Sequence, residues 1–240
     1  MHKLFFTKPC FSPFAVFSHL HVALLWTKAI GVGSRLRQVL QALFMRHGAK
    51  VELRAMCDES RETLEIAKKW PYKFNVPCYT NYETMLENEP DIEWVLIGSR
   101  SYQHVDHIVA CFEAGKNVYC EQPIAISNEH CESVIRAHQA SGKKFVTGFI
   151  QRHSPLYTKM REIISKGLLG PLVSCEANNH ISPAEGGFFM RNWRRFKAQA
   201  GPSILERCCN DIDILNWLIG SVPSKVASFG GLNIYVAAHK

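Results

Sequence analysis

The fold is decided by the stretch Leu24-Leu25-Trp26-Thr27-Lys28-Ala29-Ile30-Gly31-Val32-Gly33. Its residues 24–30 form a mostly apolar run of strand length, which leads directly into two glycines separated by one residue. Residues 35–47 follow with apolar side chains three and four positions apart, a spacing typical of an amphipathic helix. A strand, a glycine turn and a helix in this order predict the first unit of a parallel α/β sheet.

The alternation of strands and helices continues to residue 148. Further strands are predicted at 51–57, 78–79, 94–97, 117–120 and 145–148, and the helices between them at 59–70, 82–87, 104–114 and 128–141. This order predicts an α/β fold with a doubly wound parallel sheet of Rossmann type and helices on both faces. Ligands of such sheets lie at the carboxyl ends of the strands, so functional residues are expected directly after each strand.

Beyond residue 148 the pattern changes. Helices are predicted at 155–166 and 204–219, strands at 172–177 and 222–236, and a long loop at 182–197. We therefore predict an N-terminal extension at 1–23, a dinucleotide-binding Rossmann domain at 24–147, and a second, incomplete α/β domain at 148–240. The second domain is expected to serve substrate binding and oligomerisation.

The composition is that of an ordinary globular protein. The chain has 240 residues, of which 47% are hydrophobic and 20% are charged. The net charge of +7 comes from basic residues that are mostly scattered. A nucleic-acid surface and a site for an anionic cofactor both explain such an excess, and we favour the cofactor. We expect no nucleic-acid partner.

Cysteine and histidine usage sets further expectations. The nine cysteines are odd in number and contain no Cys-x-x-Cys pair, which predicts reduced thiols and a cytoplasmic protein. His19 and His21 interrupt the apolar run at 1–26, so no membrane span is expected. His104 and His107 lie three apart without a carboxylate or cysteine at ligand spacing, so we expect no metal site.

Gly31 and Gly33 match the first two glycines of a dinucleotide-binding turn. The first glycine permits the tight turn, and the second lets the backbone approach a pyrophosphate. The helix N-terminus, where Ser34 and Arg35 lie, offers free N–H groups to the phosphates. Leu36 replaces the third glycine of the fingerprint and is expected to hold the helix away from the strand or to weaken cofactor binding. A plain structural turn is the alternative interpretation.

Asp58 ends the second predicted strand, 25 residues after Gly33. A carboxylate at this place accepts hydrogen bonds from the adenosine ribose hydroxyls and repels a 2′-phosphate, which favours NAD over NADP. The alternative interpretation is an N-cap for the following helix, and the two roles are compatible.

Two later segments make the chain resemble a known family. They are Val95-Leu96-Ile97-Gly98-Ser99-Arg100-Ser101-Tyr102-Gln103-His104 and Ala114-Gly115-Lys116-Asn117-Val118-Tyr119-Cys120-Glu121-Gln122-Pro123-Ile124-Ala125. They resemble the glucose–fructose oxidoreductase / inositol dehydrogenase family (Gfo/Idh/MocA). In that family the fourth strand leads to a Pro-Asn-x-x-His-like turn, and the fifth ends in Glu-Lys-Pro. The similarity covers about residues 27–236, including 148–155, 192–194 and the helix region 201–220.

The resemblance implies an NAD(P)-dependent oxidoreductase that acts on a small sugar or polyol. A homo-oligomer is implied if the full second domain is present. Gly31 and Gly33 would meet the pyrophosphate, and Asp58 the ribose. The nicotinamide side would be lined by Ser99, His104 and Glu121. The residues expected to contact the substrate are Arg152, Trp193, Arg194 and Asp213.

At two positions the chain departs from the family. Residue 122 is usually lysine and residue 210 usually the acid/base histidine, four residues after an acidic residue on the same helix face. Here these positions hold Gln122 and Asn210, and Glu206 keeps the acidic position. These three residues are the catalytic candidates, and impaired catalysis is expected. A non-catalytic dinucleotide-binding regulatory protein and a truncated inactive form remain the alternatives.

Overall fold

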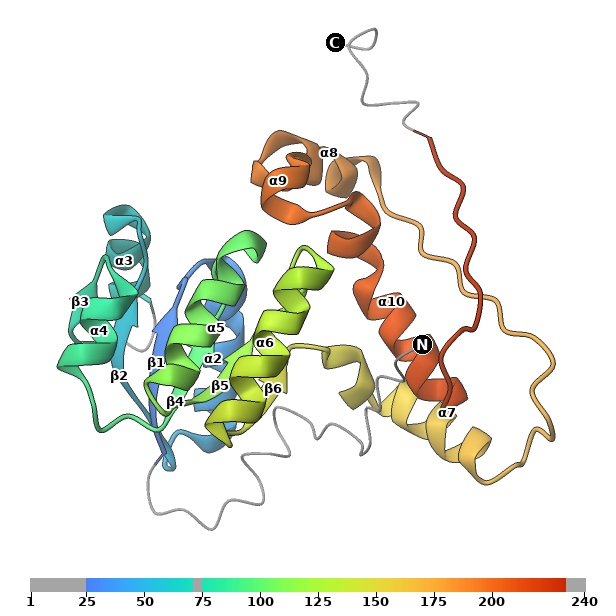
Figure 1. Ribbon diagram of the computed structural model, residues 1–240, viewed down its shortest axis with the longest axis horizontal. Helices are drawn as coiled ribbons and strands as arrows, with labels where there is room; N and C mark the ends of the chain where they lie inside the picture. The colour runs from blue at the N-terminus through green and yellow to red at the C-terminus, as the bar shows by residue number, and fades with distance from the viewer. Residues whose placement is uncertain (1–24, 71–74, 232–240) are drawn as a thin grey trace, which may run out of the picture. The chain divides into compact units, whose positions relative to one another are not determined.

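The computed structural model describes residues 25–70 and 75–231. By its internal contacts the chain divides into two compact units, Met1–Ile150 and Gln151–Lys240 (Figure 1). The predicted extension at 1–23 lies outside the described residues. Within the described ranges, no helix is both long enough and apolar enough to cross a membrane.

Unit 1 is built around a six-stranded sheet with the strand order β3-β2-β1-β4-β5-β6. Its elements are β1 Leu25–Ile30, α2 Ser34–His47, β2 Val51–Cys57, α3 Arg61–Lys68, β3 Cys78–Tyr79, α4 Tyr82–Asn88, β4 Trp94–Ile97, the 3-10 helix η1 Ser101–Gln103, α5 His104–Glu113, β5 Asn117–Cys120, α6 Asn128–Ser141 and β6 Phe145–Thr147. Every pairing is parallel. The predicted Rossmann sheet is confirmed, and the strand order reverses at β1 and β4, where such sheets bind ligands.

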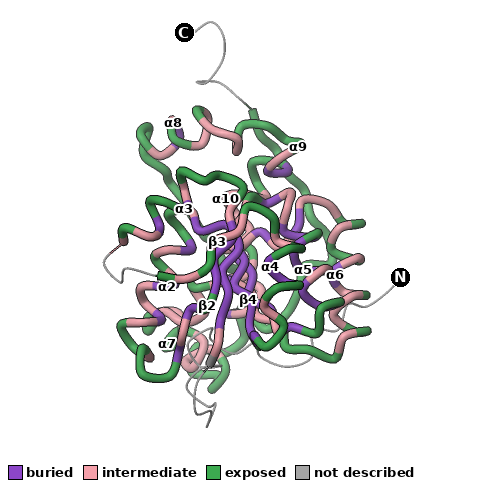
Figure 2. The backbone as a smooth tube through the Cα atoms, turned by 90° about the vertical axis from the view of Figure 1, so that its left-hand side faces the viewer, coloured by how far each residue is buried: buried purple, intermediate pink, exposed green. Residues whose placement is uncertain are grey.

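The core of unit 1 lies on both faces of this sheet. In β4, Trp94 and Leu96 join a buried cluster with residues of α2 and α3. Val95 and Ile97 point to the opposite face and join a second cluster with residues of α4, α5 and α6. Figure 2 shows the strands as the buried centre of this unit. A strand buried on both faces explains why the sequence at 94–97 is apolar without alternation.

Leu36 is accommodated by a glycine at the end of β4. Its side chain is fully buried, and a Cβ placed on Gly98 would come within 2.6 Å of the Leu36 Cβ. At this close approach of helix and strand, the glycine is therefore Gly98 at the end of β4, and no third glycine is needed in α2. The expectation that Leu36 holds the helix away is corrected accordingly.

Leu36→Gly is therefore expected to destabilise the protein and not to improve cofactor binding. Removing a fully buried leucine costs about 2 to 5 kcal/mol of unfolding free energy, and glycine in a helix adds about 1 kcal/mol. Gly98→Ala should cost about 1 to 3 kcal/mol by overpacking. The double variant should lose less than the sum, because the new methyl group enters the space that the leucine leaves. Urea unfolding of the four proteins measures this coupling, and strict additivity would contradict it.

The described part of unit 2 is helical. Its elements are η2 Ile150–His153, which crosses the unit boundary in sequence, and α7 Pro155–Ser165, α8 Pro183–Arg191, η3 Trp193–Arg195, α9 Lys197–Ala200 and α10 Ser203–Ile219. Helices α7 and α10 pack together, and Arg161 Nη1 donates to the Leu218 carbonyl oxygen at 2.8 Å. The helices predicted at 155–166 and 204–219 are confirmed.

The segment 182–197, which was expected to be a loop, contains α8, η3 and the start of α9. The sequence holds a signal for α8. Ser182 accepts from the Glu185 N–H at 3.2 Å as the N-cap, and Pro183 follows at the first helical position.

The strands predicted at 172–177 and 222–236 are not found in the described residues. Residues 172–177 and 222–231 are exposed and lie in neither a helix nor a strand, and residues 232–236 are outside the described ranges. A strand needs a neighbouring backbone for its N–H and C=O groups. Within the described ranges no segment pairs with either stretch, so their apolar sequence alone does not make them strands.

Candidate functional site

The glycine turn lies at the carboxyl end of β1, held between its two neighbouring strands. The Gly31 N–H donates to Cys57 O at 2.8 Å, and the Gly98 N–H donates to Ile30 O at 2.8 Å. Gly31 has φ +74°, and a Cβ there would lie 2.3 Å from the Ser99 nitrogen. Only glycine fits both the backbone conformation and the space.

Gly33 differs from Gly31 because the space beside it is open. A Cβ on Gly33 would meet nothing within 4 Å. Gly33 is the N-cap of α2, makes no side-chain cap bond, and no acidic residue occupies the first turn of the helix. The N–H groups of Ser34 and Arg35 belong to the first turn, which has no intrahelical acceptors. Open space beside such a helix end fits an anionic group such as a pyrophosphate.

Asp58 lies directly after β2 and beside the glycine turn. Its Oδ1 accepts from the Ser60 N–H at 3.0 Å, and it also accepts from the Val32 backbone. Burial raises the pKa of this carboxyl above its usual value. The N-cap of α3 is Ser60, whose side chain accepts from Thr63. The alternative assignment of Asp58 as that cap is therefore wrong, while the ribose-binding role stays a prediction.

Glu121 follows β5 and is held by two side chains. It is 5% exposed. Its Oε1 accepts from the Tyr119 hydroxyl at 2.7 Å and lies 3.3 Å from Arg35 Nε. Burial, more than the neighbouring carboxylate, raises the pKa of Tyr119. Sequence reasoning missed Tyr119, although residues two apart in a strand share a face. Arg35 thus pairs with Glu121 at the end of the sheet where the glycine turn lies.

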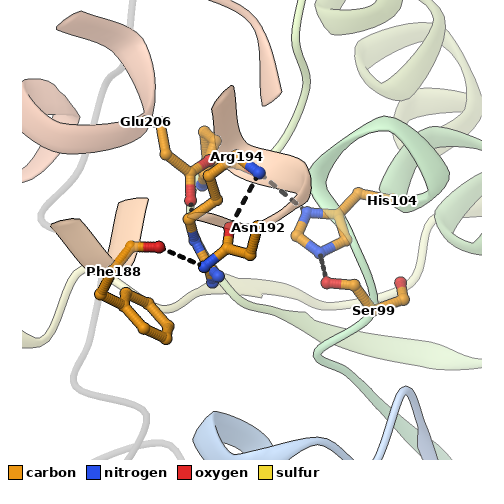
Figure 3. A network of polar contacts seen from close by, with 7 residues as sticks. Ser99, His104, Phe188, Asn192, Arg194 and Glu206 are labelled. Atoms are coloured by element: carbon orange, nitrogen blue, oxygen red, sulfur yellow. Dashed lines mark hydrogen bonds and ion pairs between the residues drawn. The ribbon is translucent and has the colours of Figure 1, made fainter. Parts of the chain in front are cut away.

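Ser99 and two histidines form a second polar group in unit 1. His104 is 1% exposed, and its Nδ1 lies 2.8 Å from Pro123 O. Its Nε2 lies 3.0 Å from Ser99 O (Figure 3). The Ser99 hydroxyl lies 2.9 Å from His107 Nδ1. His107 was considered only as a metal ligand from the sequence, and the structure shows it as the side-chain partner of Ser99.

Acidification is expected to destabilise the protein partly through His107. Burial, followed by the nearby His104, lowers its pKa from 6.5 to about 4. The unfolded chain therefore takes up a proton as the pH falls below about 6.5, while the folded chain stays neutral until about pH 4. This group should remove about 2 to 3 kcal/mol of unfolding free energy between about pH 7 and pH 4.5. Urea unfolding should show a smaller pH effect for His107→Gln. Equal pH effects would contradict a neutral, buried His107.

In unit 2 the expected substrate contacts are engaged with other side chains of the same unit. Arg152 pairs with Asp213 through Nε–Oδ2 at 2.6 Å and Nη2–Oδ1 at 2.5 Å. Arg194 Nε donates to Glu206 Oε1 at 2.8 Å, and its guanidinium carbon lies 4.4 Å from the ring centroid of Trp193. Figure 3 shows the pair of Arg194 and Glu206. The Glu206 carboxylate is thereby engaged in a charge-assisted hydrogen bond within unit 2. The substrate role of these residues stays a prediction.

Two amide side chains of unit 2 have unused acceptors. Asn210 Oδ1 and Gln151 Oε1 are buried without a hydrogen-bond partner among the described residues. Asn210 lies on α10, one turn after Glu206. Buried polar atoms are rarely left unpaired, so a hydroxyl donor from a ligand would suit these oxygens. Such a group accepts a hydrogen bond but takes no proton near neutral pH.

Two family models match the chain. The first is Gfo/Idh/MocA, an oxidoreductase family with an NAD-binding Rossmann fold, over residues 28–149. The second is the C-terminal alpha/beta domain of the same oxidoreductase family, over residues 161–237.

Among curated relatives, putative oxidoreductase YteT of Bacillus subtilis is 27% identical over 85% of this chain and 49% of its own length. Inositol 2-dehydrogenase of Salmonella typhimurium is 30% identical over 70% of this chain and 47% of its own length. Among solved structures, myo-inositol 2-dehydrogenase of Lactobacillus plantarum matches with a TM-score of 0.73 and 23% identity, over 82% of this chain and 57% of its own. The chain spans about half the length of the curated relatives it matches.

Proposed function

Because the chain belongs to the Gfo/Idh/MocA oxidoreductase family, we propose that it binds NAD at the carboxyl end of β1. The full protein would then act on a sugar or polyol and form homo-oligomers. One observation carries the cofactor proposal. The space over Gly33 is open beside a helix N-terminus with no side-chain cap. A pyrophosphate must approach the backbone closely, and it must accept hydrogen bonds from free N–H groups such as those at the start of α2.

The cofactor would be held by the first turn of α2 and by the loop after β2 in unit 1. Ser34 and Arg35 would donate backbone N–H groups to the phosphates, and Asp58 would accept from the ribose hydroxyls. Arg35 already pairs with Glu121, so that carboxylate offsets one positive charge near the phosphates and fixes the arginine side chain. When bound, NAD supplies the hydride acceptor, and the protein contributes orientation and proton handling.

The proton-handling groups are weak in this chain. Gln122 would donate a neutral hydrogen bond to the reacting oxygen, and Asn210 would orient a hydroxyl through its unpaired Oδ1. Glu206 is occupied by Arg194. Slow turnover follows from this set, and a dinucleotide-binding regulatory protein is the second candidate function. The substitution of both proton-handling positions favours that second candidate.

Asp58→Ala is expected to weaken NAD binding by about 10- to 100-fold, because hydrogen bonds to a charged group contribute about 1.5 to 3 kcal/mol. NADP should lose less or gain, since the repulsion of its 2′-phosphate is removed. Titration of both cofactors measures the preference. Asp91→Ala is the control, because Asp91 is exposed and precedes the amino end of β4. Equal binding of NAD and NADP by the unmodified chain would contradict the role of Asp58.

A further inference from the structure

His104 contacts two loops at once through the backbone. It is the first residue of α5, and its ring is 1% exposed. Nε2 lies 3.0 Å from the carbonyl oxygen of Ser99, just after β4, and Nδ1 lies 2.8 Å from that of Pro123, just after β5. In Figure 3 the ring points toward Ser99. With both nitrogens facing backbone oxygens and almost no exposed surface, the ring has no free polar atom for a ligand.

The loop after β5 is anchored through its backbone at its two ends, at Glu121 and Ser127. Strand pairing ends at Glu121, whose N–H donates to Ile97 O at 2.9 Å, and α6 begins at Asn128. Residues 121–127, all of them described, lie in neither a helix nor a strand. This loop contains Gln122, one of the three catalytic candidates. A hydrogen bond to Pro123 therefore acts on the backbone next to that residue.

The chemistry of the ring decides which contact holds the loop. Both acceptors are carbonyl oxygens, so both nitrogens donate only if the ring is an imidazolium. Burial lowers the pKa of His104 below its usual value, which favours the neutral ring with a single N–H. The tautomer with the hydrogen on Nδ1 donates to Pro123 at 2.8 Å, and the tautomer with the hydrogen on Nε2 donates to Ser99 at 3.0 Å.

We propose that His104 is a positioning residue, which holds the loop after β5 in place through Nδ1–H donated to the Pro123 carbonyl. It thereby fixes the place of the Gln122 side chain relative to the Ser99 loop. The link to cofactor binding rests on the proposed function, whereas the effect on the loop itself does not.

Two conservative variants separate this role from a general effect on packing. The amide nitrogen of asparagine overlies Nδ1 of histidine, and that of glutamine overlies Nε2. His104→Asn therefore keeps the donor to Pro123, whereas His104→Gln loses that donor and places an N–H only toward Ser99. His104→Phe removes both. His138→Phe is the matched control, because His138 Nε2 also contacts a backbone carbonyl, that of Lys143 at 2.9 Å, at the other end of α6.

Hydrogen exchange followed by mass spectrometry tests the proposal on the cofactor-free chain. Peptides that cover 121–127 should exchange about tenfold faster in His104→Gln and His104→Phe, as expected for a lost buried hydrogen bond. They should stay near the wild-type rate in His104→Asn and His138→Phe. If the asparagine and glutamine variants exchange alike, or if His104→Phe matches the wild type, the proposal is overturned. The asparagine and glutamine pair decides the matter if the phenylalanine variant does not fold.

NAD titration of the same variants then tests the link to function. His104→Gln should bind NAD about tenfold more weakly than His104→Asn. If the unmodified chain binds no NAD, the proposed function fails while the exchange result stands. If the unmodified chain binds NAD and the two variants bind it equally, the positioning role in cofactor binding is overturned.

Discussion

The double variant Gln122→Lys with Asn210→His is expected to oxidise a polyol with NAD at least about 100-fold faster than the unmodified chain. A positioned acid or base contributes about 10²- to 10⁴-fold, and the unmodified chain has neither a lysine nor a histidine at these positions. In the family that the chain resembles, the two groups handle the same proton. Each single change should therefore raise the logarithm of the turnover rate by much less than half of the increase in the double variant.

The measurement is NADH formation with inositols, hexoses and their acids. The control is the double variant Gln122→Met with Asn210→Gln. Its new side chains are similar in size to lysine and histidine but cannot handle a proton, so it should turn over at the unmodified rate. Brisk turnover by the unmodified chain would overturn the assignment of roles. A double variant that binds NAD but gains nothing would favour the regulatory protein.

Gly31→Ala is expected to have a large effect on stability, at least about 3 kcal/mol of unfolding free energy. The residue sits at φ +74°, which costs an alanine about 1 to 2 kcal/mol. Its Cβ would also lie 2.3 Å and 2.4 Å from the backbone atoms N and Cα of Ser99. The backbone at the end of β4 cannot move aside without breaking the sheet, so an overpacking cost is added.

Gly33→Ala is the matched control for this change. It places the same methyl group two residues away, at φ −61° and in open space. It should cost less than about 1 kcal/mol in urea unfolding. Equal destabilisation by the two variants would contradict the view that the turn requires Gly31, whereas only a ligand requires Gly33.

The sequence predicts unit 1 well because its elements are locally consistent. Buried strands such as 94–97 are short apolar runs, and the helices between them have helical apolar spacing. Lys28, in the central strand, is an exception to that pattern because its side chain is charged and fully buried. Its Nζ is satisfied by the carbonyl oxygens of Met85 at 3.0 Å and Glu89 at 2.6 Å, at the end of α4. A partner that is more than fifty residues away cannot be inferred from local periodicity.

The candidate site is predictable where the backbone alone places a residue. Gly31 and Asp58 follow strands, and the strand order brings the ends of β1 and β2 together. The ion pairs of Arg152 with Asp213 and of Arg194 with Glu206 depend on how helices pack in unit 2, and no spacing rule anticipates them. The strand predicted at 172–177 and the described part, 222–231, of the strand predicted at 222–236 are not formed for a related reason, since strand formation requires a paired backbone.

The most direct test of the account is calorimetric titration of NAD into the unmodified chain and into Gly33→Ala. The open space over Gly33 is where the pyrophosphate is proposed to approach. The account predicts that the unmodified chain binds NAD, and that Gly33→Ala keeps its stability but binds NAD at least about tenfold more weakly, since a methyl group blocks the approach. No binding by the unmodified chain, or equal binding by the two proteins, would contradict it.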